Sequence, residues 1–334
     1  MIKIKDDVLK RILEPYKLEI SELSFLGGGR DDSDGITYSY SSEGNKMVFK
    51  IIAWEESEEE FEHKVQKNEE RLSFVRFAGQ KGANIVYPAL SSEGKLYHKH
   101  YEDGAGYISY IMEYVSGNIN SPNDFNGDLY LRWGKAIGKM HSIAKQYPLW
   151  KGSNKLCTNG LPILSWETEW NEIDTLHYDD DVRQKWSEIH SSLSKLPQDR
   201  DVFGFTHNDP HYMNVLDDGK TLFLIDFDAA NYHLFINDIA ISLQSIMFSY
   251  SGGLARPLED KESLKRFLST LLEGYRVENQ IDNEWIKQLD LFVAYRRVML
   301  FAMLKEMITN KKSLYDSWKG EIMKTPKYVL DCLF

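Results

Sequence analysis

The sequence has little of several features that would define a class of protein at once. Its two cysteines, Cys157 and Cys332, lie far apart and lack the spacing of a metal site. A disulfide framework is therefore excluded, and buried thiols are the simplest interpretation. There is no apolar run of about 18 residues, and residues 1–16 lack the apolar core of a signal peptide. We therefore expect a reduced, cytoplasmic protein without a membrane span.

Basic residues are also scarce relative to acidic ones. Lys and Arg number 40 against 51 Asp and Glu, so the formal net charge is −11. Nucleic acids and anionic membrane surfaces attract clustered positive charge and are therefore unfavoured partners. Hydrophobic residues make up 42% of the 334 residues, enough to fill one large domain or two lobes. No repeat or low-complexity linker divides the chain, and the oligomeric state stays open.

The periodicity of the chain changes near residue 115. Before it, a short amphipathic helix (6–17) and a charged helix (about 57–78) accompany alternating patterns that predict strands at 35–41, 46–54, 83–90, 95–101 and 106–115. After it, helical spacing dominates, most clearly at 129–147, 262–277 and 284–308. We expect an α+β protein with an antiparallel lobe over 1–115 and a mainly helical lobe over 116–334.

The segment 204–230 concentrates polar side chains around an apolar strand. Asn214 follows Asp209 by five residues, and Asp226 ends the strand "TLFLID" within a hairpin predicted to turn at Asp218-Gly219. An Asp and an Asn at this spacing can both face one cleft, and a strand-terminal Asp can complete a Mg²⁺ site of hard oxygen ligands. The same layout serves phosphoryl transfer in kinases. The alternative is a hairpin with buried, hydrogen-bonded polar residues.

A family resemblance becomes specific at this point. The stretches "THNDPHYMNVL", "FLIDFDAA" and "NDIA" resemble the aminoglycoside phosphotransferase and choline kinase-like family, whose pattern is His-Gly-Asp-x-x-x-x-Asn, then Asp-Phe or Asp-Trp, then Asp-Leu-Ala. Asn208 replaces the usual Gly, and Ile239 the usual Leu. Protein kinases carry Arg before the catalytic Asp and Gly after the Asp-Phe pair. This chain has Asn208 and Asp228 there, so it is more similar to the small-molecule kinases.

The resemblance implies a two-lobed protein-kinase-like fold, with a nucleotide-binding lobe over 1–115 that includes the hinge and a catalytic and substrate-binding helical lobe over 116–334. It also implies a role for each polar residue of the segment. Asp209 would position or deprotonate the acceptor hydroxyl, and His207 would orient the loop. The metal ligands would be Asn214 and Asp226, with Asp228 aiding the metal or bracing the loop. His211 faces either the substrate or solvent.

A kinase also needs a phosphate cover and a paired lysine. Gly28 and Gly29 lie in a glycine-rich turn whose N–H groups could approach phosphates, although a simple turn is the alternative. Lys50 alternates with apolar residues in "MVFKII", so an inward position requires a partner, whereas an edge-strand lysine would face water. The candidate partners are Glu62, Glu69 and Glu70, and the spacing of Glu70 to Phe74 and Phe77 favours Glu70. The stretch "YISYIMEYVSG" resembles the kinase hinge, which implies that backbone groups of Glu113 and Val115 hold adenine.

The expected reaction is Mg²⁺-dependent transfer of the γ-phosphoryl group of ATP, with GTP as another donor to consider, to a hydroxyl of a small metabolite or aminoglycoside-like compound. Two alternatives are a protein Ser/Thr kinase of the same family and a nucleotide-binding pseudokinase or scaffold. The acceptor has no motif of its own. Trp166, Trp170 and Trp186 could form a cation–π site, but helix packing is the simpler interpretation.

Overall fold

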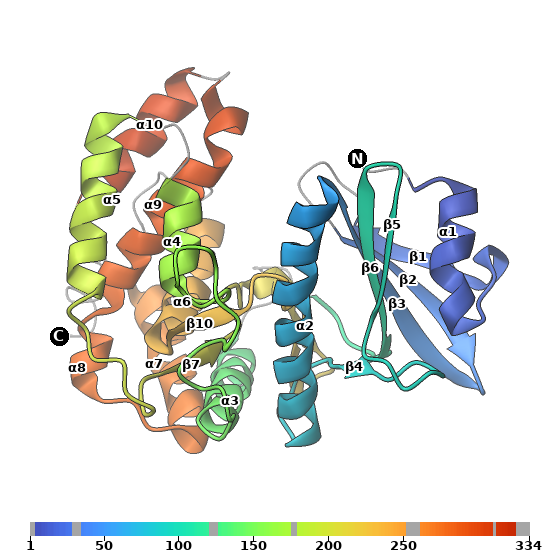
Figure 1. The fold of residues 1–334 in the computed structure, drawn as a ribbon. Coiled ribbons are helices and arrows are strands. Elements are labelled where there is room, and N and C mark those ends of the chain that lie inside the picture. Colours follow the sequence, from blue (N-terminus) through green and yellow to red (C-terminus); the bar gives the residue numbers. More distant parts are fainter. Residues whose placement is uncertain are drawn as a thin grey trace. The chain divides into compact units, whose positions relative to one another are not determined.

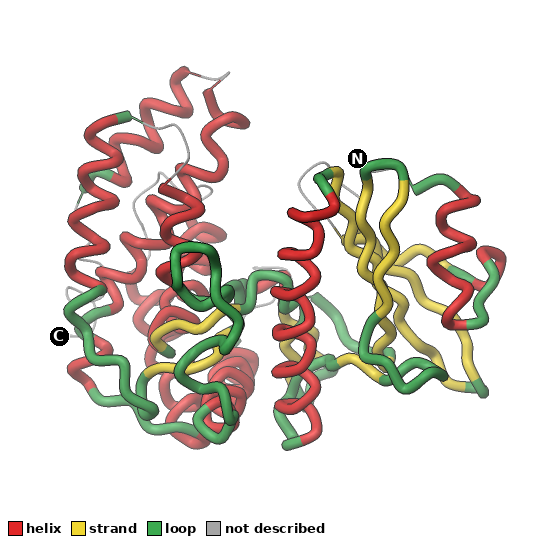
Figure 2. Tube along the Cα trace, in the orientation of Figure 1, coloured by secondary structure: helices red, strands yellow, loops and turns green. Residues whose placement is uncertain are grey.

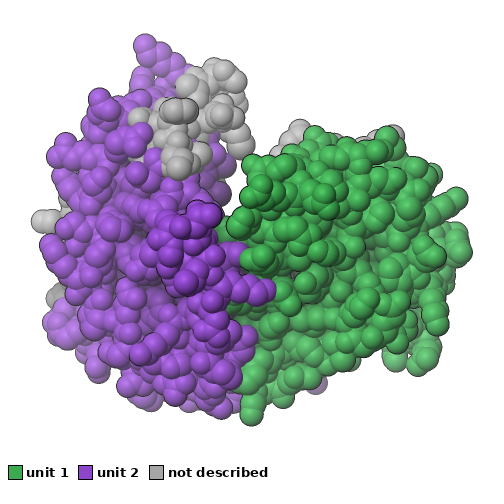
Figure 3. All heavy atoms as spheres, in the orientation of Figure 1, with its two compact units in different colours: residues 1–116 green, residues 117–334 purple. Residues whose placement is uncertain are grey.

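The computed structural model describes residues 4–28, 35–119, 126–174, 179–251, 261–309 and 312–324. The chain forms two compact units, Met1–Ser116 and Gly117–Phe334, which are coloured separately in Figure 3. No described helix is both long enough and apolar enough to cross a bilayer.

The first unit is built on one antiparallel sheet. The strand order is β1-β2-β3-β6-β4, with β5 also paired to β6. The strands are β1 (Ser24–Gly28), β2 (Gly35–Ser42), β3 (Asn45–Glu55), β4 (Pro88–Ala89), β5 (His98–Glu102) and β6 (Ala105–Glu113). The strand expected at 83–90 is reduced to β4, because Pro88 has no N–H and the residues before it form turn bonds instead, such as Ile85 N to Ala83 O at 2.9 Å.

Two helices cover opposite faces of this sheet (Figures 1 and 2). One face carries α1 (Asp6–Leu13), which continues into η1 (Glu14–Tyr16) and is followed by η2 (Ile20–Glu22). The other carries α2 (Glu58–Gln80), which begins at a capping box: Ser57 Oγ accepts Glu60 N at 3.3 Å and Glu60 Oε2 accepts Ser57 N at 3.1 Å.

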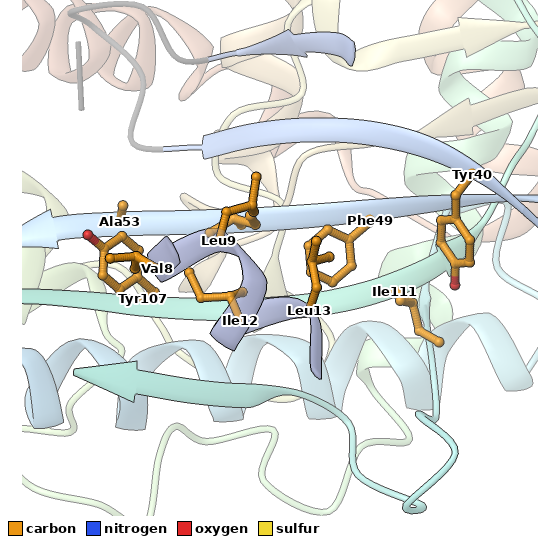
Figure 4. Close-up of a cluster of buried hydrophobic side chains, with 10 residues drawn as sticks. Val8, Leu9, Ile12, Leu13, Tyr40, Phe49, Ala53, Tyr107 and Ile111 are labelled. Carbon is orange, nitrogen blue, oxygen red and sulfur yellow. The ribbon is translucent and has the colours of Figure 1, made fainter. Parts of the chain in front are cut away.

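The alternation of side chains along β3 assigns Lys50 to one of these faces. Phe49 (Figure 4) and Ile51 lie in the core with α1, whereas Ile52 and Trp54 lie in the core with α2. Since neighbouring strand residues point to opposite faces, Lys50 shares the α2 face.

The second unit is mainly helical (Figure 2). Its helices are α3 (Gly127–Ala144), α4 (Trp166–Asp174), α5 (Asp180–Leu193), η4 (Tyr212–Asn214), α6 (Ile236–Ser251), α7 (Lys261–Glu278), α8 (Asn283–Ile286), α9 (Leu289–Thr309) and α10 (Lys312–Ile322). Two small antiparallel sheets interrupt them: β7 (Phe203–Thr206) pairs with β10 (Asn231–Leu234), and β8 (Val215–Asp217) pairs with β9 (Leu222–Leu224). The α+β fold class, with an antiparallel sheet unit and a mainly helical unit, is thereby confirmed.

Two local predictions for this unit were wrong. The continuous helix at 284–308 is split into α8 and α9. The two-residue turn at Asp218-Gly219 is a longer loop, because Asp217 pairs with Leu222 and leaves residues 218–221 between the strands. Asp218 Oδ1 accepts the N–H groups of Lys220 (2.8 Å) and Thr221 (2.7 Å), and Asp218 N donates to Thr221 O at 3.2 Å, so the chain turns over residues 218–221.

Helices α3 and α7 approach each other through glycines. A Cβ on Gly134 would lie 1.9 Å from the Leu271 carbonyl oxygen, and one on Gly274 would lie 2.1 Å from that of Leu131. The two backbones therefore pack closer than any side chain permits. This contact holds α3, which carries His141 of the site described below.

We expect Gly134→Ala to lower the free energy of unfolding by about 1–3 kcal/mol, because the methyl group would push the main chain of α7 away. Gly127→Ala is the control, since a Cβ there meets nothing within 4 Å. It should be neutral or slightly stabilising. Urea unfolding of both variants measures the difference, and equal stability would show that the close contact of α3 and α7 is unimportant.

Candidate active site

The loop that carries Asp209 is held by one buried carboxylate. After β7, the backbone N–H groups of His207 and Asn208 donate to Asp238 of α6 at 2.9 and 2.8 Å. His141 Nε2 donates to the same carboxylate at 2.9 Å. Burial lowers the pKa of His141 even though Asp238 opposes the shift, and its Nδ1 accepts the Tyr275 hydroxyl at 3.0 Å. Three donors thus compensate for the complete burial of Asp238 and fix the start of the loop.

Asn208 stands where the family pattern has glycine, and it keeps a backbone conformation typical of glycine. Its φ is 61°, in the left-handed region that glycine adopts freely and that Asn tolerates better than most residues. Its amide nitrogen donates to the Glu169 carboxylate at 3.0 and 3.2 Å and to Ala229 O at 3.1 Å, and its Oδ1 accepts Asn237 Nδ2 at 2.8 Å. Hydrogen bonds thus hold the side-chain amide of Asn208, while its backbone has the left-handed conformation that favours glycine.

Asp209 lies next on the loop, with its side chain 24% exposed. One oxygen, Oδ1, accepts Arg296 Nη2 of α9. The other, Oδ2, lies 3.4 Å from both His211 Nε2 and Asn214 Nδ2. Burial raises the pKa of Asp209, but the charge of Arg296 and the contact with His211 outweigh burial and leave the pKa below its usual value. The carboxylate is therefore ionised and suited to orienting a hydroxyl.

His207 contacts other protein groups through its ring. Its side chain is fully buried, its Nε2 donates to Ile225 O at 2.8 Å, and its ring packs on Phe227 at 4.3 Å between centroids. The residue therefore links the Asp209 loop to the segment that carries Asp226. This geometry agrees with an orienting role.

The structure brings Asn214 and the residue before Asp226 together. Ile225 N donates to Asn214 O at 3.0 Å, so the two predicted metal ligands sit on paired backbone segments. Asn214 Nδ2 donates to Asp209 O at 2.9 Å, which directs the amide oxygen away from that contact. Asp226 is exposed, with a φ of 63°, a strained conformation that is common at functional positions. Asp228 follows two residues later and is partly buried.

The side-chain oxygens of Asn214, Asp226 and Asp228 suit a Mg²⁺ ion that also binds the phosphates of a nucleotide. The described part of the chain contains no group of three or more His, Cys, Asp or Glu that could hold a metal alone. Mg²⁺ is commonly held by one or two carboxylates, an amide oxygen and substrate phosphates, so no such group is needed.

In the first unit, Lys50 is an interior residue of the sheet. It pairs with Thr37 of β2 and Tyr110 of β6, so β3 is a central strand, and its side chain is 7% exposed. The alternative of a solvated edge-strand lysine is therefore excluded.

The three candidate glutamates of α2 differ in burial and partners. Glu70 is 7% exposed. Among the described residues of this unit, Glu70 and Lys50 are the two buried members of the Lys, Arg, Asp and Glu residues. Glu62 is partly exposed and bound by Lys99 Nζ at 2.6 Å. Glu69 is also partly exposed. Burial therefore favours Glu70 as the residue that neutralises Lys50, because a buried charge needs a counter-charge.

The remaining nucleotide candidates lie at strand ends. Gly28 ends β1 with a φ of 86°, and a Cβ there would lie 2.0 Å from Gly35 O, so only glycine fits. Gly29 lies outside the described residues. Glu113 ends β6 opposite Met47, and Val115 follows the strand.

The three tryptophans of the helical unit pack in its core. Trp166, Trp170 and Trp186 are 1%, 5% and 0% exposed. Trp170 and Trp186 stack at 3.4 Å between centroids, and Tyr295 stacks on both. Helix packing is therefore the correct interpretation, and a cation–π site formed by these rings is not.

Sequence reasoning gave no role to Asp238, Arg296 or Glu169. Asp238 was visible in the family stretch "NDIA" but its contacts were not. Arg296 and Glu169 lie 87 and 39 residues from their partners in the loop, and no local pattern marks them.

Together, a sheet unit with a buried lysine and a helical unit with an Asp-x₄-Asn loop define a kinase-like phosphotransferase. Residues 58–276, more than half of the chain, match the phosphotransferase enzyme family (APH), and the chain belongs to this family. Its class is therefore that of kinases that transfer a phosphoryl group from ATP, with a divalent metal ion, to a hydroxyl group of a small molecule.

Similar proteins include kinases for several small molecules. Amicoumacin kinase of Bacillus subtilis (strain 168) is 23% identical over 313 residues, which cover 91% of this chain and 85% of that protein. The structure of an amicoumacin kinase in complex with AMP-PNP, Ca²⁺ and Ami superposes with a TM-score of 0.78 at 26% identity, covering 96% and 93% of the two chains. A microcompartment-associated aminopropanol kinase shares the fold, with a TM-score of 0.67 at 14% identity over 96% of this chain and 100% of that one.

We expect Asn208→Ala to be less stable than Asn208→Gly by about 1 kcal/mol. Both variants lose the amide contacts, but only glycine relieves the left-handed backbone. Urea unfolding measures both. If the two variants had equal stability, backbone strain at this position would have no part in the substitution.

We expect Glu70→Gln to raise the KM for ATP or lower kcat by about tenfold, which corresponds to ~1.4 kcal/mol of lost transition-state stabilisation. Glu62→Gln and Glu69→Gln are matched controls on the same helix and should be nearly silent. Steady-state kinetics with varied ATP distinguishes them. A larger effect at either control would move the lysine partner to that residue.

Proposed function

We propose that this protein transfers the γ-phosphoryl group of ATP to a hydroxyl group of an amicoumacin-like small molecule. The observation that carries the proposal is Asp209, a partly exposed, ionised carboxylate on a loop whose backbone Asp238 holds rigidly. The choice of acceptor is supported by the amicoumacin kinases, which are similar over more than nine-tenths of this chain. A cytoplasmic location, where ATP is available, is part of the proposal.

In the proposed reaction, Asp209 accepts a hydrogen bond from the acceptor hydroxyl and takes its proton as the oxygen attacks the γ-phosphorus. The bond from the γ-phosphorus to the oxygen that bridges the β- and γ-phosphates breaks, and ADP leaves. Because the pKa of Asp209 is lowered, orientation of the hydroxyl contributes more than basicity. His207 keeps the loop in place through Ile225.

The proposed metal ligands are Asn214 and Asp226, with Asp228 beside them. Bound Mg²⁺ would neutralise charge on the phosphates and align them for transfer. Lys50, neutralised by Glu70, would bind the α- and β-phosphates. Gly28 and Gly29 would cover the phosphates, and the backbone of Glu113 and Val115 would hold the adenine.

A panel of acceptors tests the function. Amicoumacin, spectinomycin, aminopropanol, choline and a protein substrate are each incubated with radiolabelled ATP or GTP and Mg²⁺. We expect labelled amicoumacin or a related hydroxyl compound in the wild type. Asp209→Asn should lower kcat by about 10²–10⁴-fold, as for loss of a proton acceptor, and leave the affinity for ATP in calorimetry nearly unchanged.

Other outcomes would contradict specific parts of the proposal. Label on protein alone would indicate a protein kinase. ATP binding without any labelled acceptor would indicate a nucleotide-binding scaffold. Wild-type turnover in Asp209→Asn would remove this residue from the mechanism.

A further inference from the structure

Helix α9 contacts the catalytic loop through Arg296. Arg296 Nη2 donates to Asp209 Oδ1, and the arginine side chain is only 12% exposed. The pair joins positions 87 residues apart in the sequence. Exposed ion pairs contribute little because solvent screens them, whereas a pair this enclosed has lost most of its water and holds its geometry more firmly.

The neighbours of Arg296 on α9 are themselves anchored. Tyr295 is 1% exposed, and its hydroxyl donates to Glu169 Oε2 of α4 at 3.3 Å. On the other side, Arg297 Nε donates to Gln244 Oε1 of α6 at 3.2 Å. Three consecutive residues of α9 therefore contact three different elements, and the backbone at Arg296 is fixed on both sides.

The same carboxylate of Glu169 also binds the loop residue before Asp209. Glu169 accepts the amide of Asn208 at 3.0 Å and the hydroxyl of Tyr295. Helix α9 thus reaches two consecutive loop residues, Asn208 indirectly and Asp209 directly.

The contacts leave the two oxygens of Asp209 unequal. Oδ1 is engaged by the guanidinium of Arg296, whereas among the described residues Oδ2 has only the 3.4 Å contacts with His211 Nε2 and Asn214 Nδ2. His211 Nδ1 accepts Met213 N at 3.1 Å, so Nε2 carries the hydrogen and points at Oδ2. Both donors near Oδ2 lie 3.4 Å away, at the long limit of hydrogen bonding, so a hydroxyl that approaches Oδ2 more closely can replace one of them.

We propose that Arg296 is a positioning residue for the phosphoryl-transfer reaction: it holds Oδ1 of Asp209 so that Oδ2 receives the acceptor hydroxyl. This role rests on the proposed kinase activity. Without the guanidinium, the Asp209 side chain can rotate, and the hydroxyl loses its alignment with the γ-phosphorus. A displacement of about 1 Å at a reacting group can cost on the order of 100-fold in rate.

The test compares Arg296→Ala and Arg296→Lys with wild type. We expect Arg296→Ala to lower kcat by about 10- to 100-fold with little change in the KM for ATP. Arg296→Lys should recover part of the rate, because it keeps the charge but loses the planar fork. Millimolar guanidinium should restore activity to Arg296→Ala and not to Asp209→Asn.

Arg132→Ala is the matched control. Arg132 forms a two-bond ion pair with Asp217 in the same unit, at 3.0 and 2.7 Å, and its side chain is 20% exposed. Its loss should lower the Tm in the manner of an ordinary ion pair, and guanidinium should not raise the kcat of this variant.

A crystal structure of Arg296→Ala tests the positioning independently of any acceptor. We expect Asp209 to leave its single rotamer. An unchanged Asp209 rotamer, or an unchanged kcat in Arg296→Ala, would overturn the role of Arg296. A kcat loss that neither lysine nor guanidinium restores would do the same. If wild type phosphorylates no acceptor, the proposed function fails while the crystal structure still decides whether Arg296 positions Asp209.

Discussion

The loop that carries Asp209 depends on one buried carboxylate. Asp238 accepts the backbone N–H groups of His207 and Asn208 and the side chain of His141, all at 2.8–2.9 Å. Backbone N–H groups beyond the end of a strand have no ladder partner, and leaving them unpaired in the interior would cost about 1–3 kcal/mol each. By satisfying two in succession, Asp238 fixes the path of the chain immediately before Asp209.

A second carboxylate, that of Glu169, fixes the same loop by binding the side chain of a loop residue and not its backbone. It binds the amide of Asn208 at 3.0 Å and the hydroxyl of Tyr295 at 3.3 Å. Glycine at position 208 would allow the left-handed backbone but could make none of the contacts of the Asn208 amide with Glu169, Ala229 and Asn237. The asparagine of this chain therefore adopts the left-handed backbone less readily than glycine would, but its amide links the loop to Glu169 of α4 and through it to Tyr295 of α9. A hydrogen-bond network contributes little to stability when one of its members is missing. We therefore expect substitution of Asn208, Glu169 or Tyr295 to weaken the whole network.

The sheet unit shows the same logic for a positive charge. Lys50 occupies the central strand β3 with apolar neighbours on its face, Ile52 and Trp54. Among the acidic residues of α2, only Glu70 of the three candidates is buried. The capping box at Ser57 sets where α2 begins, and the helical period from there decides which glutamate faces the sheet.

The sequence by itself determined the class of fold and named candidate residues for phosphoryl transfer. Alternation in "MVFKII" and the spacing of Asp209, Asn214 and Asp226 are local properties, and local pattern controls strand, helix and loop type. Prediction from local pattern failed where the local signals were weak or misleading, at the two-residue strand β4 and at the Asp218-Gly219 turn.

Tertiary structure alone decided which distant residues complete the site. Arg296 meets Asp209 across 87 residues, and Glu169 meets Asn208 across 39. It also decided that the tryptophans pack in the core, because only the arrangement of the helices determines which aromatic faces solvent. These contacts depend on how helices pack, which is set by the sum of many side-chain volumes and not by any short stretch of sequence.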